Sequence, residues 1–172
     1  IKVRAEEMNN CSHKNKGKMI ALLSSDYNKI QKIINDNTSS VVIANYNSKK
    51  QTILSGNNSE INLISNIFKS KNIRSIELNV SGAFHSKLMI DAEKSLKVLI
   101  NKSKFRDINN PLYQNYNALK HYKAKDIKHN LIQQLTSPVK WLDIINNMYT
   151  DNINNFIEVG PGYTLTKLNK NI

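Results

Sequence analysis

The sequence contains few of the residues on which several kinds of protein depend. Only one of its 172 residues is a cysteine, Cys11, which excludes a disulfide framework or a thiolate metal cluster within one chain. The longest apolar run, residues 19–23, is far too short to span a bilayer, and no secretory signal is recognisable. The length and a hydrophobic fraction of 40% instead indicate one globular domain, with room for a small insert.

Arginine is also scarce, although the formal net charge is +12. Lysine supplies 22 of the 25 basic residues, and the arginines are Arg4, Arg74 and Arg106. Because nucleic-acid surfaces rely on arginine for bidentate and stacking contacts, a nucleic-acid partner is not expected. The 27 asparagines and 22 isoleucines share AT-rich codons with lysine, so an AT-rich genome explains the composition. The positive field would still attract an acidic protein or a phosphorylated ligand.

The hydrophobic pattern of residues 18–81 predicts alternating strands and helices. Strands are expected at residues 19–23, 41–44, 52–54 and 75–81. Helices are expected after Asp26 and Ser59, since each residue can cap a helix whose isoleucines share one face. The resulting order, strand-helix-strand-strand-helix-strand, is that of a ferredoxin-like βαββαβ unit.

The residues after Ser81 have longer helices and fewer strands. Helices are expected over residues 88–100, from Asp126 to a stop before Pro138, and from Trp141 to Met148. Strands are expected at residues 111–117 and 156–159, the second ending in the turn Gly160-Pro161-Gly162. These strands are too few for a closed α/β sheet, which indicates a portion of a larger fold.

His85 is the residue most suggestive of chemistry. It follows the 75–81 strand and stands where a helix begins, so the positive end of the helix dipole disfavours its protonated form. A neutral imidazole can take a proton from a hydroxyl group. A structural histidine that caps the helix would produce the same pattern, and spacing alone leaves both interpretations open. The other three histidines lie in polar stretches whose spacing offers no metal-ligand set.

Four segments, taken together and in order, resemble the malonyl-CoA:acyl carrier protein transacylases of fatty acid synthesis. They are VVIANYNSKKQTILSG (41–56), VSGAFHSKLM (80–89), QLTSPVKW (134–141) and FIEVGPGYTL (156–165). Residues 3–8 also resemble the family's Arg-Gly-x-x-Met segment, so the likeness covers the whole chain but only the later part of the family's catalytic domain. It implies an α/β fold, in which residues 1–14 and 82–172 form part of an α/β-hydrolase-like acyltransferase core and residues 15–81 form a ferredoxin-like small subdomain.

The resemblance implies catalytic roles for two residues. His85 would act as general base and then as general acid for a serine nucleophile, oriented by the main-chain carbonyl of Gln134. Arg4 would pair with the malonyl carboxylate, because a guanidinium matches the geometry of a carboxylate. On spacing alone, Gln134 is uninformative and Arg4 reads equally well as a surface charge.

The resemblance also implies a substrate channel and a partner. Asn45 and Asn47 would line the channel for the acyl-pantetheine arm, although asparagine near a turn is commonly there for local hydrogen bonds. Phe84 would crowd an α-methyl group, so malonyl is expected over methylmalonyl. The implied substrate is malonyl-CoA and the implied partner is acyl carrier protein. The chemistry needs no metal or redox cofactor, and we expect a monomer without a nucleic-acid or membrane partner.

The sequence departs from the family's pattern at three points. Lys49 and Lys50 stand where a Pro-Gly turn is usual, and Ala5 stands where a glycine is usual. No GHSxG nucleophile elbow occurs, and neither Ser81 nor Ser86 is expected to replace its serine. The resemblance therefore implies a serine outside this chain, and the polypeptide by itself should be inactive.

Two other functions remain open. The chain could be the acyltransferase domain of a multidomain polyketide or fatty acid synthase. It could also be a non-enzymatic, basic ferredoxin-like binding module, although the 75–81 strand lacks the aromatic residues with which sheets bind RNA.

The starting residue and the composition give two further expectations. Because the sequence begins with Ile1 rather than methionine, we expect a processed product or a fragment. An AT-rich genome combined with dissociated fatty acid synthesis favours a relict, apicoplast-like plastid, with a bacterial cytoplasm as the alternative.

Overall fold

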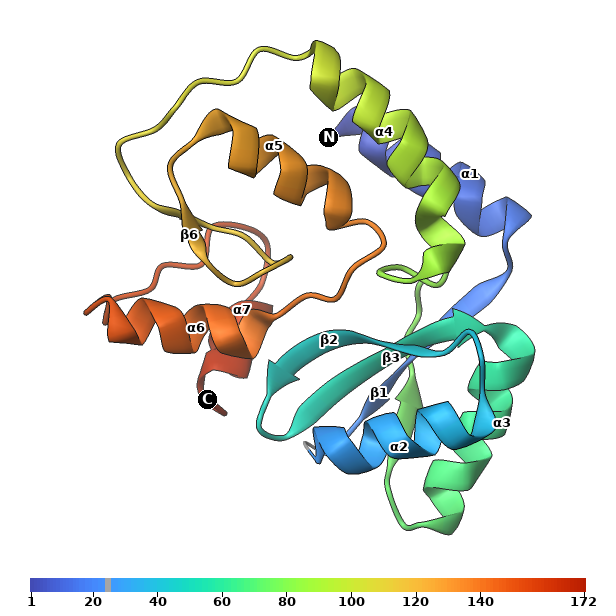
Figure 1. Ribbon diagram of the computed structural model, residues 1–172. Helices are drawn as coiled ribbons and strands as arrows, with labels where there is room; N and C mark the ends of the chain where they lie inside the picture. Colours follow the sequence, from blue (N-terminus) through green and yellow to red (C-terminus); the bar gives the residue numbers. More distant parts are fainter. Residues whose placement is uncertain (24–25) are drawn as a thin grey trace.

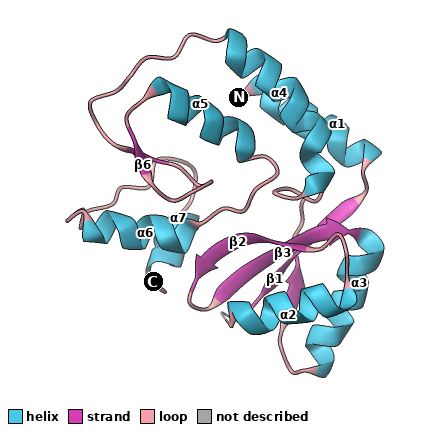
Figure 2. Cartoon of the chain, in the orientation of Figure 1, coloured by secondary structure: helices cyan, strands magenta, loops and turns pink. Residues whose placement is uncertain are grey.

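The computed structural model describes residues 1–23 and 26–172. It has an α/β architecture in which one compact sheet-and-helix unit lies beside a set of helices and long connections (Figures 1 and 2). In the described part of the chain, no helix combines the length and apolar character needed to cross a bilayer.

The first unit follows the predicted order of strands and helices. Its elements are β1 (Gly17–Leu22), α2 (Tyr27–Asn37), β2 (Val42–Ser48), β3 (Gln51–Asn57), α3 (Asn58–Ser70) and β4 (Ser75–Glu77). The strands lie in the order β2-β3-β1-β4, and every neighbouring pair is antiparallel. The βαββαβ order expected from the sequence is therefore confirmed.

Both helices of this unit cover one face of its sheet (Figure 1). Isoleucines of α2 and α3 pack there against Ile20, Leu22 and Leu54, and each of these three side chains is at most 2% exposed. Met19, Ala21 and Ile53 point to the opposite face and form a separate cluster with the loop that follows β4. Strand alternation thus commits one face to the core and leaves the other for contact with the rest of the chain.

Local capping and strand length differ in detail from the predictions. The Asp26 side chain caps α2 as predicted, accepting a hydrogen bond of 3.0 Å from the Lys29 N–H. Helix α3 is capped by Asn57 rather than by Ser59, whose hydroxyl instead donates to the Asn57 side chain. The strand predicted at 75–81 is only three residues long as β4, because the chain leaves the sheet to reach the loop that carries His85.

The rest of the chain is mostly helical. Its elements are α1 (Lys2–Lys14), the short 3-10 helix η1 (Lys87–Met89), α4 (Ile90–Lys102), β5 (Leu112–Tyr113), β6 (Lys120–His121), α5 (Ala124–Gln133), α6 (Trp141–Thr150) and α7 (Thr164–Asn169). Helix α1 was not predicted, and it packs alongside α4 (Figure 1). Cys11 of α1 joins Met89, Leu96 and Leu135 in a second core, so the N-terminal helix packs with elements far along the chain.

Of the two strands predicted in this part, one is much shorter than expected and the other is absent. The strand predicted at 111–117 is reduced to β5, which pairs only with β6 in a small hairpin. Residues 156–159 do not form a strand, because none of the described residues lies beside them as a pairing neighbour. A strand requires a partner for its backbone groups, and the alternation of residues alone cannot supply one.

Candidate active site

The loop of residues 81–86 holds His85 in an unusual backbone conformation. The φ angle of His85 is +58°, in the left-handed region that few non-glycine residues adopt. The buried hydroxyl of Ser86 donates to the Ala83 carbonyl at 2.7 Å and accepts from the Leu88 N–H at 3.2 Å. Ser86 therefore ties the residues on both sides of His85 together, and this supports a conformation that is sparsely populated in other settings.

A glycine lets this loop approach helix α1 closely. A Cβ atom on Gly82 would lie 2.7 Å from the Cβ of Ser12, closer than side-chain atoms can approach. Ser12 is itself buried and donates to the Met8 carbonyl within α1. A larger residue at position 82 would push the loop away from α1 and move His85 with it.

Two main-chain carbonyls orient the imidazole of His85. Its Nδ1 lies 2.9 Å from the Gln134 oxygen and 3.2 Å from the Ser137 oxygen. A carbonyl can only accept, so Nδ1 must carry the proton, and the neutral ring then has its lone pair on Nε2. No hydrogen bond joins Nε2 to any residue of the described chain. The ring is thus held in the tautomer that can accept a proton at Nε2.

Burial lowers the pKa of His85 below its ordinary value of 6.5, and the positive charge of Arg4 lowers it further. The hydrogen bonds to the Gln134 and Ser137 carbonyls act in the opposite direction, but burial is the larger effect. The imidazole is consequently neutral at pH 7, as a general base must be.

The segment of residues 134–139, which supplies the two carbonyls, is hydrogen-bonded to β2 at the edge of the sheet. Val139 forms an isolated parallel bridge with Asn45 of β2. The Val139 N–H donates to the Ala44 carbonyl at 2.8 Å, and the Val139 carbonyl accepts from the Tyr46 N–H at 2.9 Å. Val139 lies two residues after Ser137, whose carbonyl contacts His85. The bonds of Val139 therefore hold the carbonyl that orients His85 in place beside β2.

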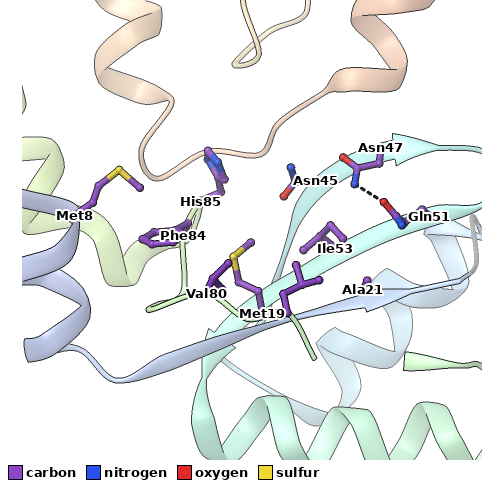
Figure 3. Close-up of a pocket in the computed structure, with 11 residues that line it drawn as sticks. Met8, Met19, Ala21, Asn45, Asn47, Gln51, Ile53, Val80, Phe84 and His85 are labelled. Carbon is purple, nitrogen blue, oxygen red and sulfur yellow. Dashed lines mark hydrogen bonds between the residues drawn. The ribbon is translucent and has the colours of Figure 1, made fainter. Parts of the chain in front are cut away.

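A pocket of about 340 Å³ opens between His85 and the free face of the sheet (Figure 3). Apolar side chains make up most of its wall, with His85 and three amide side chains as the polar groups. The lining residues are Met8, Met19, Ala21, Asn45, Asn47, Gln51, Ile53, Leu78, Val80, Phe84 and His85. Such a pocket suits a long, mainly apolar ligand with a few groups that hydrogen-bond.

A β-bulge gives the two asparagines of β2 their orientation. The register between β2 and β3 shifts between Ile43 and Asn45, so two residues of β2 advance against one of β3. Ile43 faces the helix-covered core, while Asn45 and Asn47 both face the pocket. The Asn47 amide donates to the Gln51 side-chain oxygen at 2.7 Å, and Figure 3 shows this pair at the end of the pocket away from Phe84.

Phe84 and Arg4 occupy different positions relative to the pocket. Phe84 lines it and also packs against both hydrophobic clusters on this side of the sheet. Arg4 is half-buried on α1 and does not line the pocket, but its charge acts on His85. No carboxylate of the described residues forms an ion pair with Arg4.

Four of the six predicted residues, His85, Asn45, Asn47 and Phe84, line the pocket. The main-chain carbonyl of Gln134 orients His85, and Arg4 acts on His85 through its charge, but neither residue lines the pocket. Sequence reasoning missed the Ser137 carbonyl, the Val139 bridge and the contribution of Met8 from α1. The first two act through backbone atoms, which leave no signal in a single sequence. Gln51 and Ile53 alternate along β3 and both line the pocket, a spacing that could have indicated that β3 supplies part of its wall.

The chain matches a set of curated proteins over most or all of its length. The malonyl CoA-acyl carrier protein transacylase of Bacillus subtilis (strain 168) is 33% identical over 176 residues, which cover all of this chain and 56% of that protein. The chain therefore spans about half the length of the curated relatives it matches. A scan against protein-family models finds no match.

Solved structures are likewise similar to nearly all of this chain, which again spans about half of their length. The malonyl-CoA:ACP transacylase of Synechocystis sp. PCC 6803 superposes with a TM-score of 0.88 at 32% identity, over 99% of this chain and 56% of that chain. A malonyl-transacylase solved in complex with its type II PKS acyl-carrier protein superposes with a TM-score of 0.92 at 25% identity, over 98% of this chain and 56% of that chain.

Proposed function

Because this chain is a homologue of the malonyl CoA-acyl carrier protein transacylases, we propose that the longer protein containing it transfers malonyl from malonyl-CoA to acyl carrier protein. The acceptor is the phosphopantetheine thiol of the carrier, and the product serves fatty acid synthesis. One observation carries the proposal: His85 lines the pocket and donates from Nδ1 to two carbonyls, while no other described residue forms a hydrogen bond with its Nε2. The nucleophilic serine belongs to the part of the relatives that this chain does not span.

The reaction proceeds in two balanced half-reactions. Nε2 of His85 accepts the hydroxyl proton as the serine oxygen attacks the thioester carbon of malonyl-CoA. The carbon–sulfur bond then breaks, the imidazolium returns its proton to the sulfur of coenzyme A, and a malonyl-serine ester remains. In the second half, His85 takes the proton of the carrier thiol, the sulfur attacks the ester carbon, and the proton returns to the serine oxygen. Malonyl-CoA is a substrate, and the reaction requires neither a metal nor a redox cofactor.

Arg4 holds the malonyl carboxylate. Support comes from its half-buried place near His85 and from the lack of a carboxylate partner among the described residues. A guanidinium forms two parallel hydrogen bonds to a carboxylate, which fixes the orientation of the acyl group as well as its charge. The same positive charge adds to the effect of burial in lowering the pKa of His85, so one residue serves both substrate binding and the state of the base.

The pocket holds the acyl-pantetheine arm. Asn45 and Asn47 offer amide groups that match the amides of pantetheine, and the apolar wall matches its methylene groups. Phe84 narrows the pocket beside His85 and disfavours an α-methyl group on the acyl chain. We assign residues 15–81 to a ferredoxin-like subdomain and residues 1–14 and 82–172 to the acyltransferase core, with the pocket lying between them.

The carrier belongs either to dissociated fatty acid synthesis or to a polyketide pathway. The second candidate is supported by the similar malonyl-transacylase solved with a type II PKS acyl-carrier protein. Sequence flanking the chain decides whether the enzyme stands alone or is a domain of a multidomain synthase. For the compartment we propose a relict plastid, on the AT-rich composition alone, with a bacterial cytoplasm as the alternative that the bacterial relatives favour.

The test uses the longer protein and follows formation of the malonyl-serine ester by intact-protein mass spectrometry after mixing with malonyl-CoA. We expect the wild type to become acylated within the first turnover and His85→Ala to remain unmodified. His121→Ala serves as the matched control, since its imidazole lies in β6, away from the pocket. Normal loading of the His85→Ala protein would contradict the assignment of the base.

A further inference from the structure

The turn between β2 and β3 carries two lysines next to the pocket. Lys49 and Lys50 are both exposed and form the whole of this two-residue turn, since Ser48 pairs directly with Gln51. The amides of Asn47, two residues before Lys49, and of Gln51, directly after Lys50, line the pocket. The turn that carries the two lysines therefore lies next to the end of the pocket away from Phe84.

The backbone of this turn is well supported without help from the lysine side chains. Neither lysine is among the described non-glycine residues with positive φ, so the turn does not require glycine. The Lys50 N–H donates to the Ser48 hydroxyl at 3.2 Å, and the Ser48 carbonyl accepts from the Tyr27 hydroxyl at 3.0 Å. The fold would therefore tolerate other residues at these two positions.

The charges of both lysines are available to a ligand. In the described part of the chain, neither ammonium group forms an ion pair or a side-chain hydrogen bond. Burial raises the pKa of Tyr27 and Tyr46, and the negative charge of Asp143 of α6 raises both further, so Asp143 acts at this end of the sheet. Among the described residues, however, Asp143 forms no ion pair with either lysine.

The distance from the reacting centre suits a long ligand. Asn45 lines the pocket with His85, and Lys49 follows it by four residue steps along β2, about 13 Å of extended strand. A thioester held at His85 and extended along Asn45 and Asn47 would leave the pocket at the turn (Figure 3). The group that emerges there meets two lysines.

We propose that Lys49 and Lys50 bind the phosphate at the outer end of the pantetheine arm. This inference rests on the proposed function, because it takes the arm as the ligand of the pocket. The phosphate is shared by coenzyme A and by the carrier's phosphopantetheine group, so one pair of lysines would serve both half-reactions. Ammonium groups bind phosphate as point charges and need no fixed geometry, which suits two flexible side chains on a turn.

The experiment measures equilibrium binding to the longer protein by calorimetry, with pantetheine, 4′-phosphopantetheine, coenzyme A and holo carrier protein as ligands. The variant is Lys49→Gln/Lys50→Gln, and the matched control is Lys69→Gln/Lys71→Gln, which removes two exposed lysines at the end of α3. We expect the first variant to weaken binding of every phosphate-bearing ligand about fivefold at low salt, and to leave pantetheine binding unchanged. The loss should shrink as ionic strength rises, and the control should bind like the wild type.

Three results would overturn the inference. In the first, the Lys49→Gln/Lys50→Gln variant does not lose affinity for phosphopantetheine and coenzyme A beyond any loss that it shows for pantetheine. In the second, the loss is confined to coenzyme A, which would assign the lysines to its adenosine phosphates. In the third, the loss is confined to the carrier, which would assign them to the carrier's protein surface. Failure of the wild type to form a malonyl-serine ester would refute the proposed function separately, since the binding comparison does not depend on turnover.

Discussion

At the scale of single residues, the site depends on one imidazole whose two nitrogens have different surroundings. The carbonyls of Gln134 and Ser137 fix the proton on Nδ1, and burial with the nearby charge of Arg4 keeps the ring neutral. The positive φ of His85 shows that the backbone, too, is held in a conformation that free chains seldom adopt. These three features are the ones expected of a general base, the role that we propose for His85.

Replacing Arg4 by alanine should have two effects in the longer protein. Transfer of malonyl should fall by about 10- to 100-fold while transfer of acetyl changes little, because only malonyl has a carboxylate to lose its charged hydrogen bonds. The acidic limb of the rate profile should move to higher pH, since removing a positive charge raises the pKa of His85. Steady-state rates with both substrates across pH 4 to 8 would measure these effects.

Arg4→Lys separates the two roles. It keeps the positive charge but loses the bidentate geometry, so the acidic limb should stay in place while malonyl transfer still weakens. Equal losses for malonyl and acetyl in Arg4→Ala would refute the carboxylate role.

At the scale of elements, a carboxylate in the first turn of α3 fastens the connection between α2 and β2. Glu60 accepts from the N–H groups of Ser40 and Ser39 at 2.7 and 3.1 Å, and also from both of their hydroxyl groups. These hydrogen bonds, led by that of the Ser40 N–H, lower the pKa of Glu60 from 4.5 to about 2. The ionised carboxylate thus stabilises the connection that leads into β2, the strand whose Asn45 and Asn47 line the pocket.

The depressed pKa predicts how stability depends on acid. A folded-state pKa below the unfolded value means that the contribution of Glu60 is complete above about pH 4.5 and is lost as the pH falls towards 2. Glu60→Gln should lower the free energy of unfolding at pH 7 by about 1 kcal/mol, after allowance for screening by solvent. It should also flatten the acid side of the stability curve, measured by denaturant unfolding at several pH values.

Glu77→Gln is the matched control, because Glu77 forms only an exposed ion pair with Lys18. Its effect should be smaller than that of Glu60→Gln at neutral pH. Identical acid curves for the wild type and Glu60→Gln would show that the hydrogen bonds to Ser39 and Ser40 do not stabilise the fold.

The elements also show which parts of the fold a single sequence can predict. Strict alternation and caps such as Asp26 reveal the βαββαβ unit, because each strand there has its partners within the chain. Helix α1 escaped prediction because only Cys11 and Ser12 are buried in it, so no apolar stripe marks its inner face. Residues 156–159 were predicted as a strand from their composition alone, and a strand depends on neighbours that composition does not report.

The side chains of the site were predictable from the sequence, whereas the backbone features that position them were not. The resemblance indicated His85, Asn45, Asn47 and Phe84, and all four line one pocket. The β-bulge at Ala44 and the bridge at Val139, which aim these side chains, are backbone features without a residue signature. Sequence therefore indicated the residues but could not indicate their geometry.

At the scale of the whole molecule, an apolar strip near the C-terminus has no cover among the described residues. Ile157 and Val159 are 90% and 94% exposed, and Tyr163 is 72% exposed. Contiguous exposed apolar residues of this kind mark an interaction surface. Since the relatives are nearly twice as long as the chain they match, we expect the part of the longer protein that this chain does not span to cover the strip.

This expectation gives a prediction for the stability of the longer protein. Ile157→Asp or Val159→Asp should lower its free energy of unfolding by about 3 kcal/mol, because each places an unpaired charge in a buried contact. Asn155→Asp, at an exposed neighbouring position, should change it little. Thermal unfolding of the three variants would test this, and wild-type stability in both apolar-to-Asp variants would contradict a covered strip.

The most direct test of the whole account is the distance between two atoms in a crystal structure of the longer protein. We predict a serine of a nucleophile elbow with its Oγ about 2.6–3.2 Å from Nε2 of His85, within hydrogen-bond reach. A structure in which no serine hydroxyl lies near that nitrogen, or in which a structural donor occupies it, would contradict acyl transfer at this site.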